Sequence, residues 1–300
     1  MIYLKTLKVS NYCGYKQNDF VFFDKDIPKL FNIFYGPNGV GKSNLLYAIN
    51  IISNIYRLSN KQNNNVMFRK LIHNENYDPG YQLFELEQVL KLEAIFTDGK
   101  KDYKVTVNTN LKDENGEKDT TCVELNELKE LYSERREFAL YVDADSPMQT
   151  NVFQIRADCK DIFEKFSSEV YDFKVSLPEN KKVKSSEKDD AITFYTDMVI
   201  LKPNNIQTHY RSMSAGEKKV ATMLRILFND LYNVEDTPNI IIIDNIEMHV
   251  YFERHLRLME QLEEYFPDKQ FFATTHSSDI VNGMDKKYLY NLKEYVYGKD

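Results

Sequence analysis

The chain has 300 residues, 42% of them hydrophobic and 28% charged, so it is long enough to bury a core as one large domain or two ordinary ones. No stretch reaches the roughly 20 apolar residues that span a bilayer, no signal peptide is recognisable, and three scattered cysteines are too few for a disulfide framework or a zinc ligand set. The formal net charge of −7 argues against attraction of the whole surface to nucleic acid and leaves only a local basic site open. We therefore expect a cytoplasmic protein that does not enter a membrane.

The N-terminal part of the chain is predicted to form strands followed by a helix. Alternating apolar residues predict a strand over residues 3–9, an apolar run predicts another over 20–23, and a third is predicted over 29–35. A helix is predicted over 43–58 because apolar residues recur there at helical spacing, namely at Leu45, Leu46, Ile49, Ile52 and Ile55. A glycine-rich stretch thus lies between a strand and a helix.

This glycine-rich stretch carries a phosphate-binding pattern. It reads Gly36, Pro37, Asn38, Gly39, Val40, Gly41, Lys42 and Ser43, which matches G-x-x-x-x-G-K-[ST]. In such a loop the backbone N–H groups up to Asn44 wrap the phosphates, Lys42 reaches the β- and γ-phosphates, and Ser43 binds Mg²⁺. The pattern is too rare for an ordinary glycine turn to compete with it, so ATP and Mg²⁺ are the predicted cofactors.

The middle of the chain differs in composition. Residues 59–205 contain stretches rich in asparagine, lysine and glutamate that are typical of loops. Within this region we predict one β-hairpin, closed by Asp98 and Gly99, and two helices: the hairpin strands over residues 89–96 and 103–108, and the helices over 124–137 and 159–170.

The C-terminal part again shows strong periodicity. We predict two helices and two strands, in the order helix 215–232, strand 240–243, helix 252–266 and strand 270–275. The strand at 240–243 consists of four isoleucines, which suits a strand buried on both faces of a sheet. Asp244 follows it directly, where a carboxylate can reach Mg²⁺ beside the glycine loop or, alternatively, cap the next helix. The glycine loop favours the metal role.

Two further motifs resemble those of a known family. Residues Ser214, Ala215, Gly216 and Glu217 precede a predicted helix and resemble the S-x-G-E signature of ABC ATPases, although alone they could be capping chemistry. His276 follows the last predicted strand and matches the switch histidine of that family, which contacts the γ-phosphate. A histidine there without the other motifs would more often be structural.

Within the ABC ATPases, the glycine loop, residues 7–12 and the Asp-x-x-Glu-x-His sequence from Asp244 resemble the RecF, SMC and OLD-like branch. This resemblance implies an α/β P-loop ABC-ATPase head, with a mixed β-sheet flanked by helices, formed by residues 1–58 and 206–300. Residues 59–205 would be an inserted α+β lobe. It also implies a homodimer that sandwiches two ATP molecules, each P-loop facing residues 214–217 of the other subunit. Members of the branch act on DNA ends or serve as ATPase subunits of bacterial anti-phage and toxin systems.

The sequence departs from the family at the catalytic glutamate. Asn245 stands directly after Asp244, where that glutamate is expected, and Glu247 follows two residues later. An asparagine can orient the attacking water but cannot accept its proton. Either Glu247 substitutes, or hydrolysis is slow and an ATP-bound dimer is long-lived; the second is favoured because in-line geometry tolerates little misplacement.

Two other positions depart from the family pattern. Its N-terminal Asn-Phe-Arg appears here as Asn11, Tyr12 and Cys13, which removes an arginine that could touch phosphate. For the glutamine-bearing loop, Gln82 and Gln88 are the candidates, although an ordinary surface glutamine is the commoner reading for each.

Three functions follow from these observations. The first is an ATP-dependent, dimerising ATPase that regulates a protein partner in a DNA-linked or anti-phage process. The second is a RecF-like repair ATPase that binds duplex DNA, for which residues 181–184 with Arg135 and Arg136 are the basic clusters, although such runs are usually solvated faces. The third is a nucleotide-gated scaffold with negligible hydrolysis, motivated by Asn245.

Overall fold

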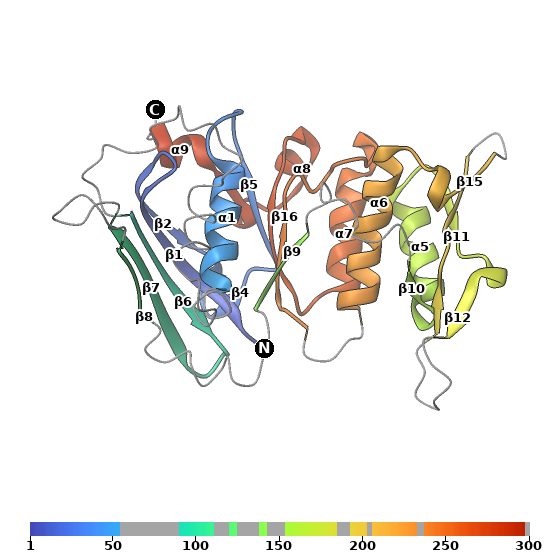
Figure 1. Cartoon of the computed structure of the whole chain (residues 1–300). Coiled ribbons are helices and arrows are strands. Elements are labelled where there is room, and N and C mark those ends of the chain that lie inside the picture. Colours follow the sequence, from blue (N-terminus) through green and yellow to red (C-terminus); the bar gives the residue numbers. More distant parts are fainter. Residues whose placement is uncertain are drawn as a thin grey trace.

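Two five-stranded sheets form the framework of the protein in a computed structural model (Figure 1). The structure describes residues 1–54, 90–110, 120–124, 138–142, 154–184, 193–202, 206–232 and 237–297. Within these ranges no helix is both long enough and apolar enough to cross a membrane.

The first sheet is antiparallel, with the strand order β2-β1-β6-β7-β8. Its strands are β1 (Tyr3–Tyr12), β2 (Tyr15–Val21), β6 (Leu90–Thr97), β7 (Asp102–Asn110) and β8 (Thr120–Glu124). The predicted hairpin is confirmed as β6 and β7, which pair along the whole length of β6. Its turn forms because the Asp98 carboxylate accepts the backbone N–H groups of Lys100 and Lys101, both at 2.8 Å, while Gly99 adopts φ 87°.

The second sheet is parallel throughout, with the order β18-β5-β17-β16-β9. Its strands are β5 (Phe31–Tyr35), β9 (Ala139–Val142), β16 (Ile240–Ile243), β17 (Gln270–Thr274) and β18 (Leu289–Asn291). The predicted strands at 29–35, 240–243 and 270–275 are thus confirmed. Because all five strands run the same way, the segments that follow β5, β16 and β17 emerge at one edge, where ligands bind in open α/β sheets.

The parallel sheet lies between two hydrophobic clusters, and β16 shows how. Ile240 and Ile242 face the cluster shared with α1 and the antiparallel sheet, whereas Ile241 and Ile243 face the cluster shared with α5, α6 and α7. This alternation follows from the two-residue period of a strand. Figure 1 shows the same layers, with α1 beside the antiparallel sheet and α7, α6 and α5 on the opposite side. These helices are α1 (Lys42–Ser53), α5 (Lys160–Val170), α6 (Ala215–Arg225) and α7 (His255–Tyr265).

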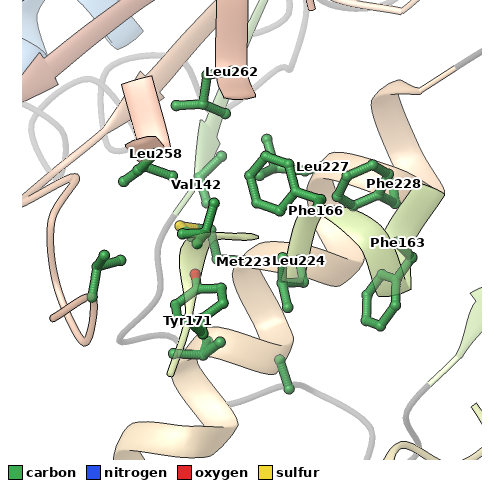
Figure 2. Close-up of a cluster of buried hydrophobic side chains, with 14 of the residues drawn as sticks. Val142, Phe163, Phe166, Tyr171, Met223, Leu224, Leu227, Phe228, Leu258 and Leu262 are labelled. Carbon is green, nitrogen blue, oxygen red and sulfur yellow. The ribbon is translucent and has the colours of Figure 1, made fainter. Parts of the chain in front are cut away.

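The cluster on the helical side combines aliphatic and aromatic side chains, among them Leu224, Phe166 and Phe228 (Figure 2). The Phe228 ring meets the rings of Phe163 and Phe166 edge-on, with centroids 5.8 and 5.2 Å away. Phe228 belongs to a π-helical segment, η4 (Ile226–Leu231), that continues α6. The predicted helix over 215–232 is therefore present, but its last part is wound as a π-helix rather than an α-helix.

The remaining elements are short. They are β3 (Phe23–Asp24), β4 (Ile27–Pro28), β10 (Ile155–Arg156), η1 (Ala157–Cys159), β11 (Lys174–Ser176), η2 (Glu179–Lys181), β12 (Lys182–Lys184), β13 (Thr193–Tyr195), β14 (Val199–Leu201), β15 (Gln207–His209), η3 (Tyr210–Ser212), η5 (Phe252–Arg254), α8 (Ser278–Gly283), η6 (Lys286–Tyr288) and α9 (Leu292–Tyr297). The strands β10, β13 and β12 form one small sheet, and β11, β14 and β15 form another. Strands of two or three residues are too short to show a period in the sequence, so none of these six was predicted.

The structure corrects the placement of the hairpin. It was expected inside the inserted lobe, but β6 pairs with β1 from Tyr3 to Ser10 and so extends the N-terminal sheet. Likewise β9, from the same central region, pairs in parallel with β16. Local sequence patterns cannot show which distant strand supplies a partner, and this is why both pairings were missed. The division into a head and an inserted lobe remains a prediction.

The three helices predicted before residue 171 agree with the structure to different extents. The helix predicted over 43–58 is present as α1, and its residues beyond 54 lie outside the described part of the chain. The helix predicted over 159–170 is confirmed as α5 preceded by η1. Of the helix predicted over 124–137, residue 124 ends strand β8 and the rest lies outside the described residues.

Candidate functional site

The glycine-rich loop connects β5 to α1, as predicted. Gly36, Gly39 and Gly41 have φ angles of 144, 79 and 93°, a region of backbone conformation that strongly favours glycine. A side chain on Gly39 would meet no atom within 4 Å, whereas one on Gly41 would lie 3.1 Å from the ring of Tyr15. The loop is therefore open on one side and supported by an aromatic ring on the other, which fits a cradle for phosphate groups.

Lys42 lies at the start of α1 with its ammonium group turned back to the loop. Its Nζ donates to the carbonyl oxygens of Gly36 and Pro37 at 3.0 and 3.2 Å. Burial lowers the pKa of Lys42, and the nearby carboxylates of Asp244 and Glu247 oppose that effect. The glycine loop and the segment after β16 thus lie close enough in one chain for their charges to interact.

Asp244 is fixed by the neighbouring strand. The buried hydroxyl of Thr274, at the end of β17, donates to Oδ1 of Asp244 and accepts the backbone N–H of Asn245 at 2.8 Å. Asp244 does not cap a helix, because the chain turns before the next helical segment begins at Phe252. The arrangement is compatible with the metal-binding role and not with the capping alternative.

Residues 245–249 form a tight turn directly after Asp244. Asn245 and His249 have φ angles of 52 and 64°, in the left-handed region, where asparagine and histidine occur more often than most residues. The N–H of Ile246 donates to the carbonyl of Thr274 at 3.0 Å, which ties the turn to β17. This turn places the second carboxylate, Glu247, beside the loop that follows β17.

The structure brings Glu247 and the backbone of His276 into contact. Oε1 of Glu247 accepts the backbone N–H of His276 at 2.7 Å, and Oε2 accepts the hydroxyl of Thr275 at 2.7 Å. The His276 side chain itself is exposed at the sheet edge. Asp244, Asn245, Glu247 and His276 therefore lie on two adjacent loops, as expected for residues that follow neighbouring parallel strands.

Two supporting residues were missed in the sequence. The hydroxyl of buried Tyr15 donates to the carbonyl of Gly41 at 3.0 Å, beneath the glycine loop. Buried His255 joins the segments that follow β16 and β17. Its Nδ1 lies 2.7 Å from the hydroxyl of Ser277, and its Nε2 lies 3.0 Å from the carbonyl of Val250. Neither residue belongs to a motif, and no local signal would have found them.

The predicted signature begins helix α6. Ser214 is its N-cap and forms a capping box with Glu217, whose carboxylate accepts the N–H of Ser214 at 2.8 Å. Lys202 pairs with the other oxygen of Glu217 at 2.9 Å. Burial tends to raise the pKa of Glu217, but the hydrogen bonds from Lys202 and Ser214 outweigh it and lower the pKa. Ser214 and Glu217 therefore cap the helix, as the alternative interpretation expects. Because this helix start is exposed, capping leaves it accessible to a second subunit.

The start of α6 also meets the 245–249 turn of the same chain. A side chain on Gly216 would lie 3.1 Å from two ring atoms of His249, so any larger residue would require this ring to shift. Ala215 at this helix start is exposed. The contact of the signature with a nucleotide of a second subunit remains a prediction.

The two residues expected to bind Mg²⁺, Ser43 and Asp244, both offer oxygen atoms, which are the ligands that this ion prefers. Among the described residues, no group of three or more histidine, cysteine, aspartate or glutamate side chains could hold an ion. Ser43, at the first turn of α1, and Asp244 would supply two oxygen ligands. Mg²⁺ keeps waters and binds substrate phosphates in addition to one or two protein oxygens, so this small set is adequate for it.

The other candidates from the sequence do not occur among the site residues that the structure describes. Gln82, Gln88, Arg135 and Arg136 lie outside the described residues. Residues 182–184 form the exposed strand β12, and Lys182 lies 3.8 Å from Glu179, so this cluster carries acidic charge as well.

The turn between β1 and β2 contains the position at which the family has an arginine. Burial raises the pKa of the Cys13 thiol to about 11, so this side chain is neutral and cannot replace the missing positive charge.

The amino-acid sequence is similar to those of a known protein family and of two known ATPases. The family described as the RecF/RecN/SMC N terminal domain matches residues 3–295. The Retron Ec83 probable ATPase of Escherichia coli is 28% identical over 102 residues, which is 32% of this chain and 19% of that protein. The Retron Vc95 probable ATPase of Vibrio cholerae serotype O1 biovar El Tor is 28% identical over 112 residues, 35% of this chain and 22% of that protein. The chain thus matches only about a fifth of either relative's length.

A solved structure shows the same fold. The Smc head bound to the C-terminal winged-helix domain of ScpA superimposes with a TM-score of 0.57 at 14% identity, covering 94% of this chain and 92% of that one. At this identity the likeness concerns the fold alone, and it confirms the predicted α/β head fold.

Proposed function

Because the chain belongs to the RecF/RecN/SMC N-terminal domain family, we propose that it binds Mg-ATP at the edge formed by β5, β16 and β17 and dimerises around the nucleotide. The observation that carries this proposal is the convergence of Lys42, Asp244 and the His276 loop at one edge of the parallel sheet. The three groups come from segments far apart in the sequence and meet where such sheets bind ligands.

Each residue has a defined task in this proposal. The backbone of residues 36–44 and the ammonium group of Lys42 hold the phosphates, while Ser43 and Asp244 hold the metal. Bound Mg²⁺ supplies positive charge that offsets the negative charge of the phosphates. Thr274 fixes the Asp244 carboxylate, and the exposed His276 side chain faces the terminal phosphate.

Hydrolysis by this site is proposed to be slow. Asn245 follows the metal-binding aspartate, and its amide can orient water but cannot take up a proton. Its left-handed backbone, φ 52°, is well suited to asparagine or aspartate and would strain most other residues. A slowly hydrolysing dimer persists long enough to act as a nucleotide-held switch for a partner.

The proposed partner is a protein in a cytoplasmic DNA-linked or anti-phage process. The similarity to two retron ATPases supports this class of process. The Smc head with the same fold binds a domain of another protein, ScpA, which supports a protein effector. We favour this function over duplex DNA binding because Lys182, in the basic cluster that the structure describes, lies 3.8 Å from the carboxylate of Glu179.

Oligomeric mass and ATP turnover, measured on the same preparation with and without Mg-ATP, test the proposal. The native protein should dimerise only with Mg-ATP, and Lys42→Ala should remain monomeric. Lys100→Ala removes an exposed lysine at the hairpin turn and serves as the matched control, which should dimerise normally. A native protein that stays monomeric with bound ATP would contradict the dimer.

The role of Asn245 is tested separately. Asn245→Asp restores a carboxylate while tolerating the left-handed backbone, and turnover should rise at least about tenfold. Turnover that is brisk in the native protein, or unchanged in the variant, would show that Asn245 does not limit hydrolysis.

A further inference from the structure

Both carboxylate oxygens of Glu247 accept a hydrogen bond. Oε1 accepts the N–H of His276 and Oε2 accepts the hydroxyl of Thr275, both at 2.7 Å. A general base must turn an oxygen toward the proton that it removes. A carboxylate with both oxygens held by the next loop is better placed to fix that loop than to take up a proton.

Both donors to Glu247 belong to the loop after β17 that carries His276. Thr275 is 1% exposed, and its hydroxyl also accepts the N–H of Ser277 at 3.0 Å. His276, between them, has an exposed side chain and a backbone held by Glu247. The carboxylate therefore determines where the backbone beneath the histidine ring lies, while the ring remains available to a ligand.

The turn that carries Glu247 is itself held in place. Its first residue, Asn245, donates its N–H to Thr274, and Ile246 donates to the carbonyl of Thr274 at 3.0 Å. At its other end, the ring of His249 lies against Gly216. A turn fixed at both ends can transmit its position to the loop that it contacts.

We propose that Glu247 is a positioning residue that holds His276 toward the terminal phosphate of ATP, rather than the base for hydrolysis. This inference rests on the proposed function, because it assumes that the site binds ATP. It assigns Glu247 a task in distinguishing ATP from ADP, which differ only in the group that His276 would contact.

The consequence is a specific loss in selectivity. Glu247→Ala removes an ionised acceptor from the backbone of His276, and hydrogen bonds to charged groups are among the stronger ones in proteins. We expect the ratio of ATP to ADP affinity to fall about tenfold, whereas ADP affinity stays within about twofold of native.

Glu247→Gln separates the two roles. The amide oxygen can still accept the N–H of His276, and the hydroxyl of Thr275 can rotate to accept an amide hydrogen. A positioning role therefore predicts that Glu247→Gln retains the selectivity that Glu247→Ala loses. A base cannot be replaced by an amide, so a catalytic role predicts that both variants lose turnover equally.

The experiment measures equilibrium binding of Mg-ADP and of a non-hydrolysable Mg-ATP analogue by calorimetry, and ATP turnover alongside. The variants are Glu247→Ala, Glu247→Gln, His276→Ala and the double alanine variant, with the exposed Glu253→Ala as the matched control. Because Glu247 acts through His276, the double variant should lose no more selectivity than His276→Ala alone. If Glu247→Ala does not fold, Thr275→Val removes the Oε2 contact and should lower the ratio about threefold.

The outcomes are distinct. Native selectivity in Glu247→Ala, or additive losses in the double variant, would overturn the positioning role. Equal loss of turnover in Glu247→Ala and Glu247→Gln at native selectivity would establish Glu247 as the base. A native protein that binds neither nucleotide would contradict the proposed function itself, which is a different result from any of these.

Discussion

The two large sheets share a hydrophobic cluster but differ in what their strand ends hold. The strands of the parallel sheet are followed by segments that carry Lys42, Asp244 and His276. In its described part, the antiparallel sheet contributes the Tyr15 hydroxyl, which supports the carbonyl of Gly41. Parallel strands bring all their carboxyl ends to one edge, and antiparallel strands alternate their ends between two edges. The comparison assigns the candidate site to the parallel sheet, and the antiparallel sheet acts on that site through packing.

The largest effect is expected from a substitution that removes a contact in the core between the sheets. Phe272 in β17 is fully buried, and its ring meets edge-on, at a centroid distance of 4.8 Å, the ring of Phe22, which directly follows β2 in the shared cluster. Phe272→Ala should destabilise the protein by about 3–5 kcal/mol through lost burial and a cavity, measured by urea unfolding. Leu92→Ala, in the antiparallel sheet, should cost about 2–4 kcal/mol while leaving ATP binding to the folded protein unchanged. A change below about 1 kcal/mol in Phe272→Ala would contradict the shared core.

A smaller effect is expected at the end of β17. Thr274→Val keeps the size of the side chain but removes the hydroxyl that donates to Asp244 and accepts from Asn245. The loss should be about 1–3 kcal/mol of stability, and Mg²⁺ should enhance ATP binding less than in the native protein. Thr106→Val, at a buried threonine of β7, is the matched control and should leave the Mg²⁺ dependence native. Identical Mg²⁺ dependence in Thr274→Val would show that the hydroxyl does not position Asp244.

The sequence predicted the parts of the site that follow a buried strand. The glycine loop, Asp244 and His276 each follow an apolar run, so local pattern was sufficient to locate them. The tie between Glu247 and His276 joins positions 29 residues apart, and pairing between distant segments leaves no local trace. The same reason explains the missed partner of β6.

Other features depended on packing rather than pattern. His255 looks like any polar residue at the start of a helix, and only the folded structure shows that it joins Ser277 to Val250. The π-helical end of α6 has the same composition as an α-helix. That Asn245 departs from the family pattern remains a prediction, and its left-handed backbone was not foreseeable.

The contribution of the antiparallel sheet to the site can be measured at Tyr15. Tyr15→Phe removes the hydrogen bond to Gly41 and keeps the ring beneath the loop. Stability should fall by about 1 kcal/mol, and ATP affinity by about fivefold as the loop loses support. Tyr103→Phe removes a comparable bond to Asp98 in the hairpin and should leave ATP affinity native. Equal affinities in the two variants would mean that the antiparallel sheet does not act on the loop.

The smallest expected effect depends on pH. Burial, and then the charge of Lys219, lower the pKa of His249, so the unfolded chain binds a proton more readily than the folded one. Stability is therefore complete above the unfolded value of about 6.5 and falls as the pH drops below it. His249→Asn tolerates the left-handed backbone and should reduce the fall in melting temperature between about pH 7.5 and 5.5. An unchanged pH dependence would exclude His249 as its source.

Equilibrium binding of ATP, with Mg²⁺ and with a chelator, tests most directly whether the glycine loop and the ends of β16 and β17 form one nucleotide site. Native protein should bind Mg-ATP, Asp244→Asn should lose the benefit of Mg²⁺, and Lys42→Ala should bind about 100-fold more weakly, or about 2.7 kcal/mol. Absence of binding by the native protein, or native affinity in Lys42→Ala, would contradict the site.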